Sequence, residues 1–150
     1  MTTTVSYDDF PSLLGKDLGQ SDWIEVTQDR INTFADAADD HQWIHVDPER
    51  AKDGPFGAPI AHGLLTLSLF IPMWAQMLEV EGVGTKVNYG FDKVRFVSPV
   101  KAGDRIRLGA TIAEITEIPG GYQFAVDGTI EIDGGQKPAA VIRNIQRFYA

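Results

Sequence analysis

The chain has 150 residues and a formal net charge of −8, and its composition of 43% hydrophobic and 23% charged residues is that of a globular protein rather than a disordered one. The acidic balance argues against nucleic-acid binding, because neutralising phosphates requires a basic face. The absence of cysteine excludes disulfides, thiolate metal sites and a cysteine nucleophile, and it fits a reducing cytoplasm.

A chain of this length can enclose one hydrophobic core, so we expect a single domain over residues 1–150 with its core at about residues 20–149. The first nine residues have neither the basic nor the apolar region of a signal peptide, so we expect none, and we expect a cytoplasmic protein. Residues 23–26 are typical of a short strand. Residues 28–38 then have an apolar stripe at helical spacing after Thr27, a favourable N-cap, and predict a helix.

A second, short helix should begin at Asp47 and Pro48 and stop at Gly54. From Gly54 to Leu78 no residue is charged, a length that could span a bilayer. Glycines and prolines interrupt this stretch, so we predict no membrane span but an irregular loop and then a buried helix from about His62 to Leu78, kinked or broken at Pro72. On its deepest face we place Leu64, Leu67, Ser68, Ile71, Trp74, Ala75 and Leu78.

The remainder of the chain has the two-residue alternation of strands. Four are expected, at residues 86–97, 105–115, 122–132 and 139–149. Turns containing Gly120 and Gly134 join the last three strands as hairpins. Long antiparallel strands after one apolar helix predict an α+β domain in which the sheet curls around the helix.

The densest group of chemically active side chains lies between the two predicted short helices, from Asp39 to Asp47. Asp40 and His45 are close enough in sequence for a turn to direct both into one pocket, where a carboxylate and an imidazole can hold and deprotonate a water. Gly63 opens the apolar helix, and its backbone N–H is a candidate oxyanion donor. Spacing alone also permits ordinary structural roles for all three residues.

A metal site is the alternative chemistry for this part of the chain, because His41, His45 and His62 are potential ligands. The first two are expected in a turn and so lack the helical frame of a zinc-binding HExxH motif, and no further ligand set is evident. We therefore predict no metal and no cofactor.

At these residues the chain resembles the MaoC-like dehydratases, also called (R)-specific enoyl-CoA hydratases or hydratase 2. Their motif Gly-Asp-x-Asn-Pro-(Leu/Ile/Val)-His-x-Asp is similar to residues 39–47, and their Ile-Val-His-Gly-Met stretch is similar to residues 60–64. Asn88-Tyr89-Gly90 and Val94-Arg95-Phe96 match two further elements. The resemblance spans about residues 20–149 and is nearest to the nodulation protein N-like and mycobacterial hydratase-like subgroup.

The resemblance implies a hot-dog fold, in which an antiparallel sheet wraps a long central helix, and a homodimer with no nucleic-acid partner. It implies that Asp40 and His45 are the catalytic pair and that the Gly63 N–H forms the oxyanion hole. It also implies substrate binding by a set of five residues. These are Gln42, Trp43, His62, Tyr89 and Arg95.

Three positions depart from the family motif, since Asp39 replaces glycine, Gln42 replaces asparagine and Trp43 replaces proline. Gln42 can keep the amide hydrogen bonding, and Trp43 is a candidate wall of the acyl pocket. If CoA binds this acidic protein, a local basic patch must exist. Its candidates are Lys93, Arg95, Lys101, Arg143 and Arg147.

The expected function is reversible hydration of trans-2-enoyl-CoA to (R)-3-hydroxyacyl-CoA, in fatty acid metabolism. A 3-hydroxyacyl-carrier-protein dehydratase, which performs the same chemistry with a different handle, is the near alternative. A non-catalytic acyl-thioester-binding protein and a thioesterase are alternatives from other classes, because the fold alone does not determine the activity.

Overall fold

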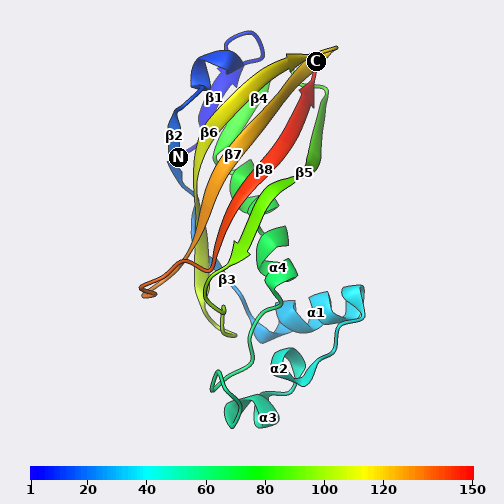
Figure 1. Ribbon diagram of the computed structural model, residues 1–150, viewed down its shortest axis with the longest axis vertical. Helices are drawn as coiled ribbons and strands as arrows, with labels where there is room; N and C mark the ends of the chain where they lie inside the picture. Colours follow the sequence, from blue (N-terminus) through cyan, green and yellow to red (C-terminus); the bar gives the residue numbers. More distant parts are fainter.

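The computed structural model describes residues 1–150 and shows a long curved sheet beside a central helical segment (Figure 1). Four long antiparallel strands form most of the sheet: β5 (Thr85–Phe96), β6 (Arg105–Ile118), β7 (Gly121–Ile132) and β8 (Ala140–Tyr149). The strand order is β2-β6-β7-β8-β5, with β2 (Asp17–Gln20) at one edge, β5 at the other and β3 (Ile24–Glu25) also paired with β6. The expected α+β hot-dog architecture is confirmed.

The alternation in the sheet follows the predicted pattern. On β6 the residues Ile106, Leu108, Ala110 and Ile112 are all buried, while their neighbours are more exposed. This face packs toward the helix. The two-residue period in the sequence therefore identifies the buried face of the sheet.

The central helix is shorter than predicted and is divided in two. It comprises α4 (Gly63–Ser68) and α5 (Phe70–Ala75), and Leu78 belongs instead to strand β4 (Leu78–Glu81). The break at Leu69 lies three residues before Pro72, the residue expected to cause it. Pro72 has no N–H to donate to the Ser68 carbonyl, and its ring clashes with that carbonyl, so the helical pattern is interrupted one turn upstream.

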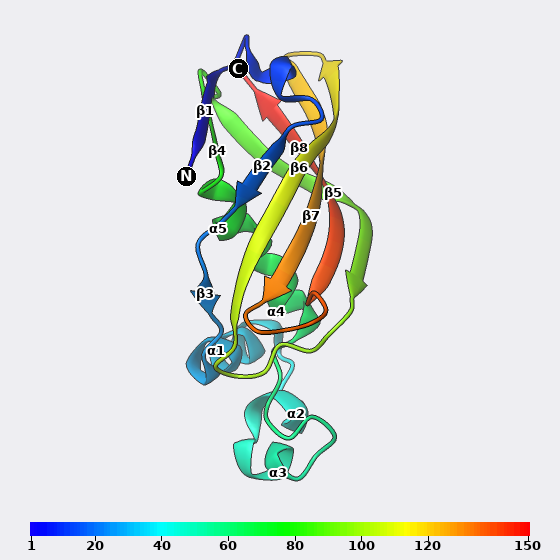
Figure 2. The ribbon, with the colours of Figure 1, turned by 90° about the vertical axis from the view of Figure 1, so that its left-hand side faces the viewer.

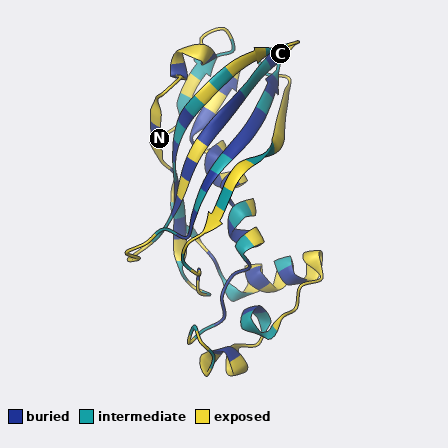
Figure 3. Ribbon diagram, in the orientation of Figure 1, coloured by how far each residue is buried: buried dark blue, intermediate teal, exposed yellow.

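The predicted buried face of this helix is wrong at most positions, although Trp74 and Leu78 are buried as expected. Leu64 is 63% exposed, and Ser68, Ile71 and Ala75 share its exposed side. The core is filled by Trp74 together with other residues of the helix, namely Leu65, Thr66, Leu69, Phe70 and Met73. A helix that is apolar on every side offers no contrast between faces, so the sequence alone could not identify the buried one. Figure 3 shows exposed patches along this helix.

The N-terminal segment adds to the core, which begins earlier than residue 20. Strand β1 (Thr3–Ser6) pairs in parallel with β4, and a 3₁₀ turn, η1 (Phe10–Leu13), follows it. Phe10 is completely buried, and its ring packs against Phe124 and Phe148. The segment thus closes the end of the sheet near the C-terminus (Figure 2).

Three short helices lie at the other end of the sheet (Figures 1 and 2): α1 (Gln28–Ala38), α2 (Trp43–Val46) and α3 (Pro48–Lys52). The bounds of α1 and the start of α3 agree with the sequence, whereas α2 was expected only as a turn. Thr27 caps α1 and Asp47 caps α3, each accepting from a backbone N–H with its side chain. No helix has both the length and the apolar character needed to cross a membrane.

Candidate active site

The first candidate residue, Asp40, follows directly from the end of α1. Asp39 caps this helix in the left-handed conformation, with φ of 55°. The Asp40 N–H donates to the Ala35 carbonyl at 3.1 Å, which reverses the chain and leaves the Asp40 side chain exposed. The left-handed φ explains why the family motif has glycine at the position of Asp39.

The second candidate, His45, is held by backbone contacts on α2. Its side chain is buried, with 7% of the residue exposed, and Nδ1 lies 2.6 Å from the Ile60 carbonyl oxygen. Because a carbonyl only accepts, Nδ1 carries the proton and donates, which leaves Nε2 of the neutral ring with a free lone pair. Gln28 Nε2 donates to the backbone carbonyl of His45 at 2.7 Å and fixes the same turn from α1.

The environment of His45 favours its neutral form. Burial lowers the pKa of the imidazole below its ordinary value, and the neighbouring His62 lowers it further. The hydrogen bond to Ile60 and the charge of Asp40 oppose these effects without overcoming them. A neutral His45 at physiological pH can accept a proton at Nε2, as a general base must.

His62, the N-cap of α4, is 3% exposed. Its Nε2–H donates to the backbone carbonyl of Asp40 at 2.9 Å, and its Nδ1 has no hydrogen-bond partner. The ring stacks on His45, with centroids 3.8 Å apart and planes 23° apart, and it also contacts Phe34. His62 therefore ties the Asp40 turn to the start of the central helix.

One ligand-type atom from each of Asp40, His45 and His62 lies within 4.8 Å of the others, a spacing that invites comparison with a metal centre. The stacked rings do not suit one. A histidine binds a metal through a lone pair in the plane of its ring, and two nearly parallel planes separated by a ring stack do not converge on a common ion. The arrangement suits hydrogen bonding to a small polar molecule better.

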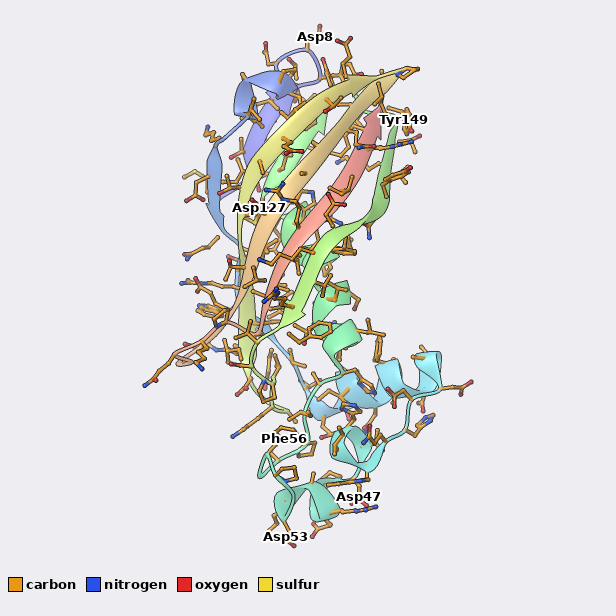
Figure 4. All side chains as sticks on the ribbon, in the orientation of Figure 1. Asp8, Asp47, Asp53, Phe56, Asp127 and Tyr149 are labelled. Carbon is orange, nitrogen blue, oxygen red and sulfur yellow. The ribbon has the colours of Figure 1, made fainter.

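Gly63 begins α4 beside this cluster, and its N–H donates to no acceptor within the protein. It lines a pocket of about 290 Å³ with mostly apolar walls. A Cβ at this position would lie 2.8 Å from the ring of Phe96, so only glycine fits beneath that ring. The walls are Phe56, Ile60, Ala61, Gly63, Thr66, Phe96, Val97, Ser98, Pro99, Val100 and Ala139; Figure 4 labels Phe56 in the loop after α3.

Two of the expected substrate-binding residues have structural contacts near the cluster. Gln42 caps α2 with its backbone, and its N–H lies 3.4 Å from the Asp40 carboxylate, but its side chain has no hydrogen bond. The Trp43 ring lies 4.3 Å from the Arg50 guanidinium and against Gly54. Trp43 thus fastens α2 to α3 and is not among the residues that line the pocket beside Gly63. Its expected role as a wall of the acyl pocket stays a prediction.

The other two expected binding residues lie on β5. Tyr89 sits at a bulge of this strand, stacked under Arg147 at 3.7 Å. It is seven residues from Phe96, so about 20 Å of extended strand separates it from the Gly63 pocket within one chain. Arg95 is exposed beside Phe96 and forms no ion pair. Arg95 is next in sequence to the pocket residue Phe96 but does not line the pocket, and Tyr89 is remote from it.

The other candidate cations differ in whether they already form hydrogen bonds or ion pairs within the protein. Arg143 donates to both carboxylate oxygens of Asp127, labelled in Figure 4, and Arg147 donates to Gln123. Lys101 has no ion pair, and its bridge to Ile60 places it beside the pocket.

Sequence reasoning missed two residues of the pocket. Phe96 was part of the family resemblance but received no role, and Thr66 received no attention. Thr66 could have been found, because it follows Gly63 by three residues and so shares its helix face. The position of the Phe96 ring depends on strand pairing and has no local signal.

The chain is similar to known proteins over most of its length. The MaoC like domain matches residues 9–129. The chain is 46% identical over 151 residues to 3-hydroxyacyl-thioester dehydratase Z of Mycobacterium tuberculosis, covering 100% of each chain. It is 45% identical over 139 residues to nodulation protein N of Rhizobium leguminosarum bv. viciae, covering 90% of this chain and 86% of the relative. The solved (R)-hydratase from A. caviae involved in PHA biosynthesis superposes with a TM-score of 0.73 at 23% identity, covering 89% of this chain and 94% of that one.

The fold and these matches define a hot-dog protein of the hydratase and dehydratase type. The chain belongs to the MaoC-like domain family, as the motifs in its sequence predicted. The expectation of a hydro-lyase is confirmed at the level of reaction class, since the relative that matches over its full length is named a dehydratase.

Proposed function

We propose that the protein is an (R)-specific enoyl-CoA hydratase, which reversibly converts trans-2-enoyl-CoA and water to (R)-3-hydroxyacyl-CoA. One observation carries the proposal: the Asp40 carboxylate lies beside a neutral His45 whose Nε2 lone pair is free, and the pocket of the unpartnered Gly63 N–H adjoins them through Ile60. These are the groups that water addition next to a thioester requires.

In the proposed reaction Asp40 and His45 hold one water molecule between them. The pair removes a proton from the water as its oxygen bonds to Cβ of the substrate. The electrons of the double bond move toward the thioester, and the Gly63 N–H stabilises the negative charge on the carbonyl oxygen. The pair then delivers a proton to Cα, so the substrate gains one water in total and the enzyme returns to its starting protonation state.

Two free cations support CoA as the handle of the substrate. Arg95 precedes Phe96 and Lys101 follows Val100, so both are next in sequence to residues that line the pocket, and neither forms an ion pair. In a protein of net charge −8, unpaired cations on the segments that form the pocket are a candidate local attraction for the phosphates of CoA. The 46% identical relative, named for 3-hydroxyacyl-thioesters, supports this class of substrate.

The proposed assembly is a homodimer through the β5 edge. β5 has a free edge and mostly exposed residues, and unpaired strand edges tend to pair with another chain. Exposed large apolar side chains lie on this strand, at the residue directly after it, and on α4 and α5 beside it. They are Leu64, Ile71, Val87, Tyr89, Phe96 and Val97.

We further propose that residues 1–150 act as one domain in cytoplasmic fatty acid metabolism.

The decisive experiment is a hydration assay with purified protein. Short and long trans-2-enoyl-CoA substrates are each mixed with the enzyme, and hydration is followed by loss of the enoyl-thioester ultraviolet absorbance. The product is then resolved by chiral chromatography, where we expect the (R)-3-hydroxyacyl-CoA. An (S) product, or tight acyl-CoA binding without turnover, contradicts the proposal.

The same assay separates the near alternative. Enoyl-carrier-protein substrates of equal acyl length are compared with the CoA substrates, and we expect kcat/KM to be higher for CoA. A preference for the carrier protein would instead identify a 3-hydroxyacyl-carrier-protein dehydratase, since the two functions share their chemistry and differ in the handle.

A further inference from the structure

The pocket beside Gly63 contains one deeply buried hydroxyl. Thr66 is 3% exposed and lines the pocket, and its Oγ forms no hydrogen bond with the protein. The oxygen is not sealed in the core, because the one enclosed and unpartnered side-chain atom of the chain is His62 Nδ1. The part of the Thr66 hydroxyl that is still accessible therefore faces the pocket.

This hydroxyl departs from the usual behaviour of threonine in a helix, where it often donates to the carbonyl four residues earlier. Here that carbonyl belongs to His62, and it already accepts from the backbone N–H groups of Leu65 and Thr66, at 3.0 Å and 3.1 Å. The Thr66 hydroxyl is therefore free to donate to a ligand that enters the pocket.

Thr66 also has a defined relation to Gly63. The two residues are three apart on α4 and therefore lie on one face, one above the other. Apart from Thr66 and Ser98, the side chains of the pocket are apolar, and Ser98 lies only partly buried in the loop after β5. The N–H of Leu64 is also without an acceptor, but among the side chains of the pocket the buried hydroxyl of Thr66 is the donor that shares a helix face with Gly63.

We propose that the Thr66 hydroxyl is a second hydrogen-bond donor to the thioester carbonyl oxygen, acting together with the Gly63 N–H; this rests on the proposed hydratase function. A carbonyl oxygen has two lone pairs and can accept from both donors at once. As the enolate forms, its oxygen becomes more negative and both hydrogen bonds strengthen, which lowers the barrier. Thr66 is then a catalytic residue, because it touches the reacting group.

The kinetic test compares Thr66→Val, which keeps the shape and removes the hydroxyl, with Thr66→Ser, which keeps the hydroxyl. We expect Thr66→Val to lower kcat about 10- to 100-fold with a smaller change in KM, somewhat less than the loss seen for a full oxyanion donor. Thr66→Ser should stay within about threefold of wild type by the same reasoning. Thr116→Val, at an exposed position of β6, is the matched control and should leave kcat unchanged.

Two outcomes overturn the proposal: Thr66→Val within about twofold of wild type, or Thr66→Ser as impaired as Thr66→Val, which would indicate packing rather than donation. Thr66→Ala provides a second variant without the hydroxyl if Thr66→Val folds poorly, which circular dichroism reports.

A spectroscopic test does not depend on turnover. A saturated acyl-CoA labelled with ¹³C at the carbonyl is bound to His45→Ala protein, and its C=O stretch is measured by difference infrared spectroscopy. We expect the bound carbonyl to absorb at lower frequency than in water, and Thr66→Val to reverse part of that shift. If wild-type protein fails to hydrate but the Thr66-dependent shift is present, the proposed function fails and the contact stands; if hydration proceeds without any dependence on Thr66, only the contact fails.

Discussion

The sheet and the segment that carries the candidate catalytic residues are stabilised by different forces. The main core cluster contains 26 buried residues, and only Ile31 and Ala61 of these come from the site segment, residues 27–62. The site segment is instead fixed by polar contacts to backbone: Gln28 to the His45 carbonyl, His45 to the Ile60 carbonyl and His62 to the Asp40 carbonyl. Burial thus stabilises the sheet, while directional hydrogen bonds position the site.

This difference means that activity and stability can be separated by mutation. A side chain of the site segment that faces the pocket can be removed with little loss of apolar burial. A core side chain of the sheet can be removed with a large loss of stability, while the site segment keeps its hydrogen bonds.

The largest effect is expected at the catalytic pair. His45→Ala and Asp40→Asn should each lower kcat about 10³- to 10⁴-fold if the two residues act on one water. Asp40→Asn should change the melting temperature little because Asp40 is exposed, whereas His45→Ala also removes the buried hydrogen bond to Ile60 and should lower it. His41→Ala is the matched control, because His41 is exposed and paired with Asp36 outside the site. Steady-state kinetics of the purified variants measure this effect, and a His45 or Asp40 variant within tenfold of wild type would exclude the proposed mechanism.

The next largest effect is expected in the sheet. Phe10→Ala should lower the free energy of unfolding by about 3–5 kcal/mol, because it removes a completely buried ring from an aromatic cluster. Urea denaturation measures the loss, and kcat of the folded protein should change little. Leu14→Ala, at an exposed position of the same segment, should have almost no effect on either quantity. A loss of kcat as large as the loss of stability would show that the sheet and site segment are not independent.

The same contrast explains what the sequence could predict. Alternating residues on β6 and β7 and the capped stripe of α1 are local patterns, so these elements were found with nearly correct bounds. Local spacing suggested Asp40, His45 and the Gly63 N–H as candidates, but only the family motifs favoured catalytic roles for them over structural ones. The pairing of β1 with β4, the buried face of α4 and the position of Phe96 over Gly63 depend on contacts between distant segments, and no local pattern encodes them.

The third prediction concerns pH and tests whether His45 acts in its neutral form. Because burial lowers the pKa of His45, the acid limb of the kcat/KM profile should lie below the ordinary histidine value of 6.5. The unfolded chain binds a proton at His45 more readily than the folded one, so the free energy of unfolding should fall as pH drops below 6.5 and level off below the folded pKa. His45→Asn should remove this part of the pH dependence of stability. An acid limb above pH 6.5 contradicts the assignment. A free energy of unfolding that rises on acidification in the wild type but not in His45→Asn also contradicts it.

The smallest effect is expected at the junction between α1 and the Asp40 turn. Asp39 has φ of 55°, a conformation that costs free energy for residues with a Cβ, although less for aspartate than for most. Asp39→Gly should therefore raise the free energy of unfolding by about 0.5–1 kcal/mol, and Asp39→Ala should lower it by a similar amount. Neither change removes a contact made by the Asp40 or His45 side chain, so kcat should stay within about twofold of wild type. If Asp39→Gly instead lowers kcat strongly, the site segment depends on the rigidity of this turn as well as on its hydrogen bonds, because glycine would then let the Asp40 carboxylate move away from His45.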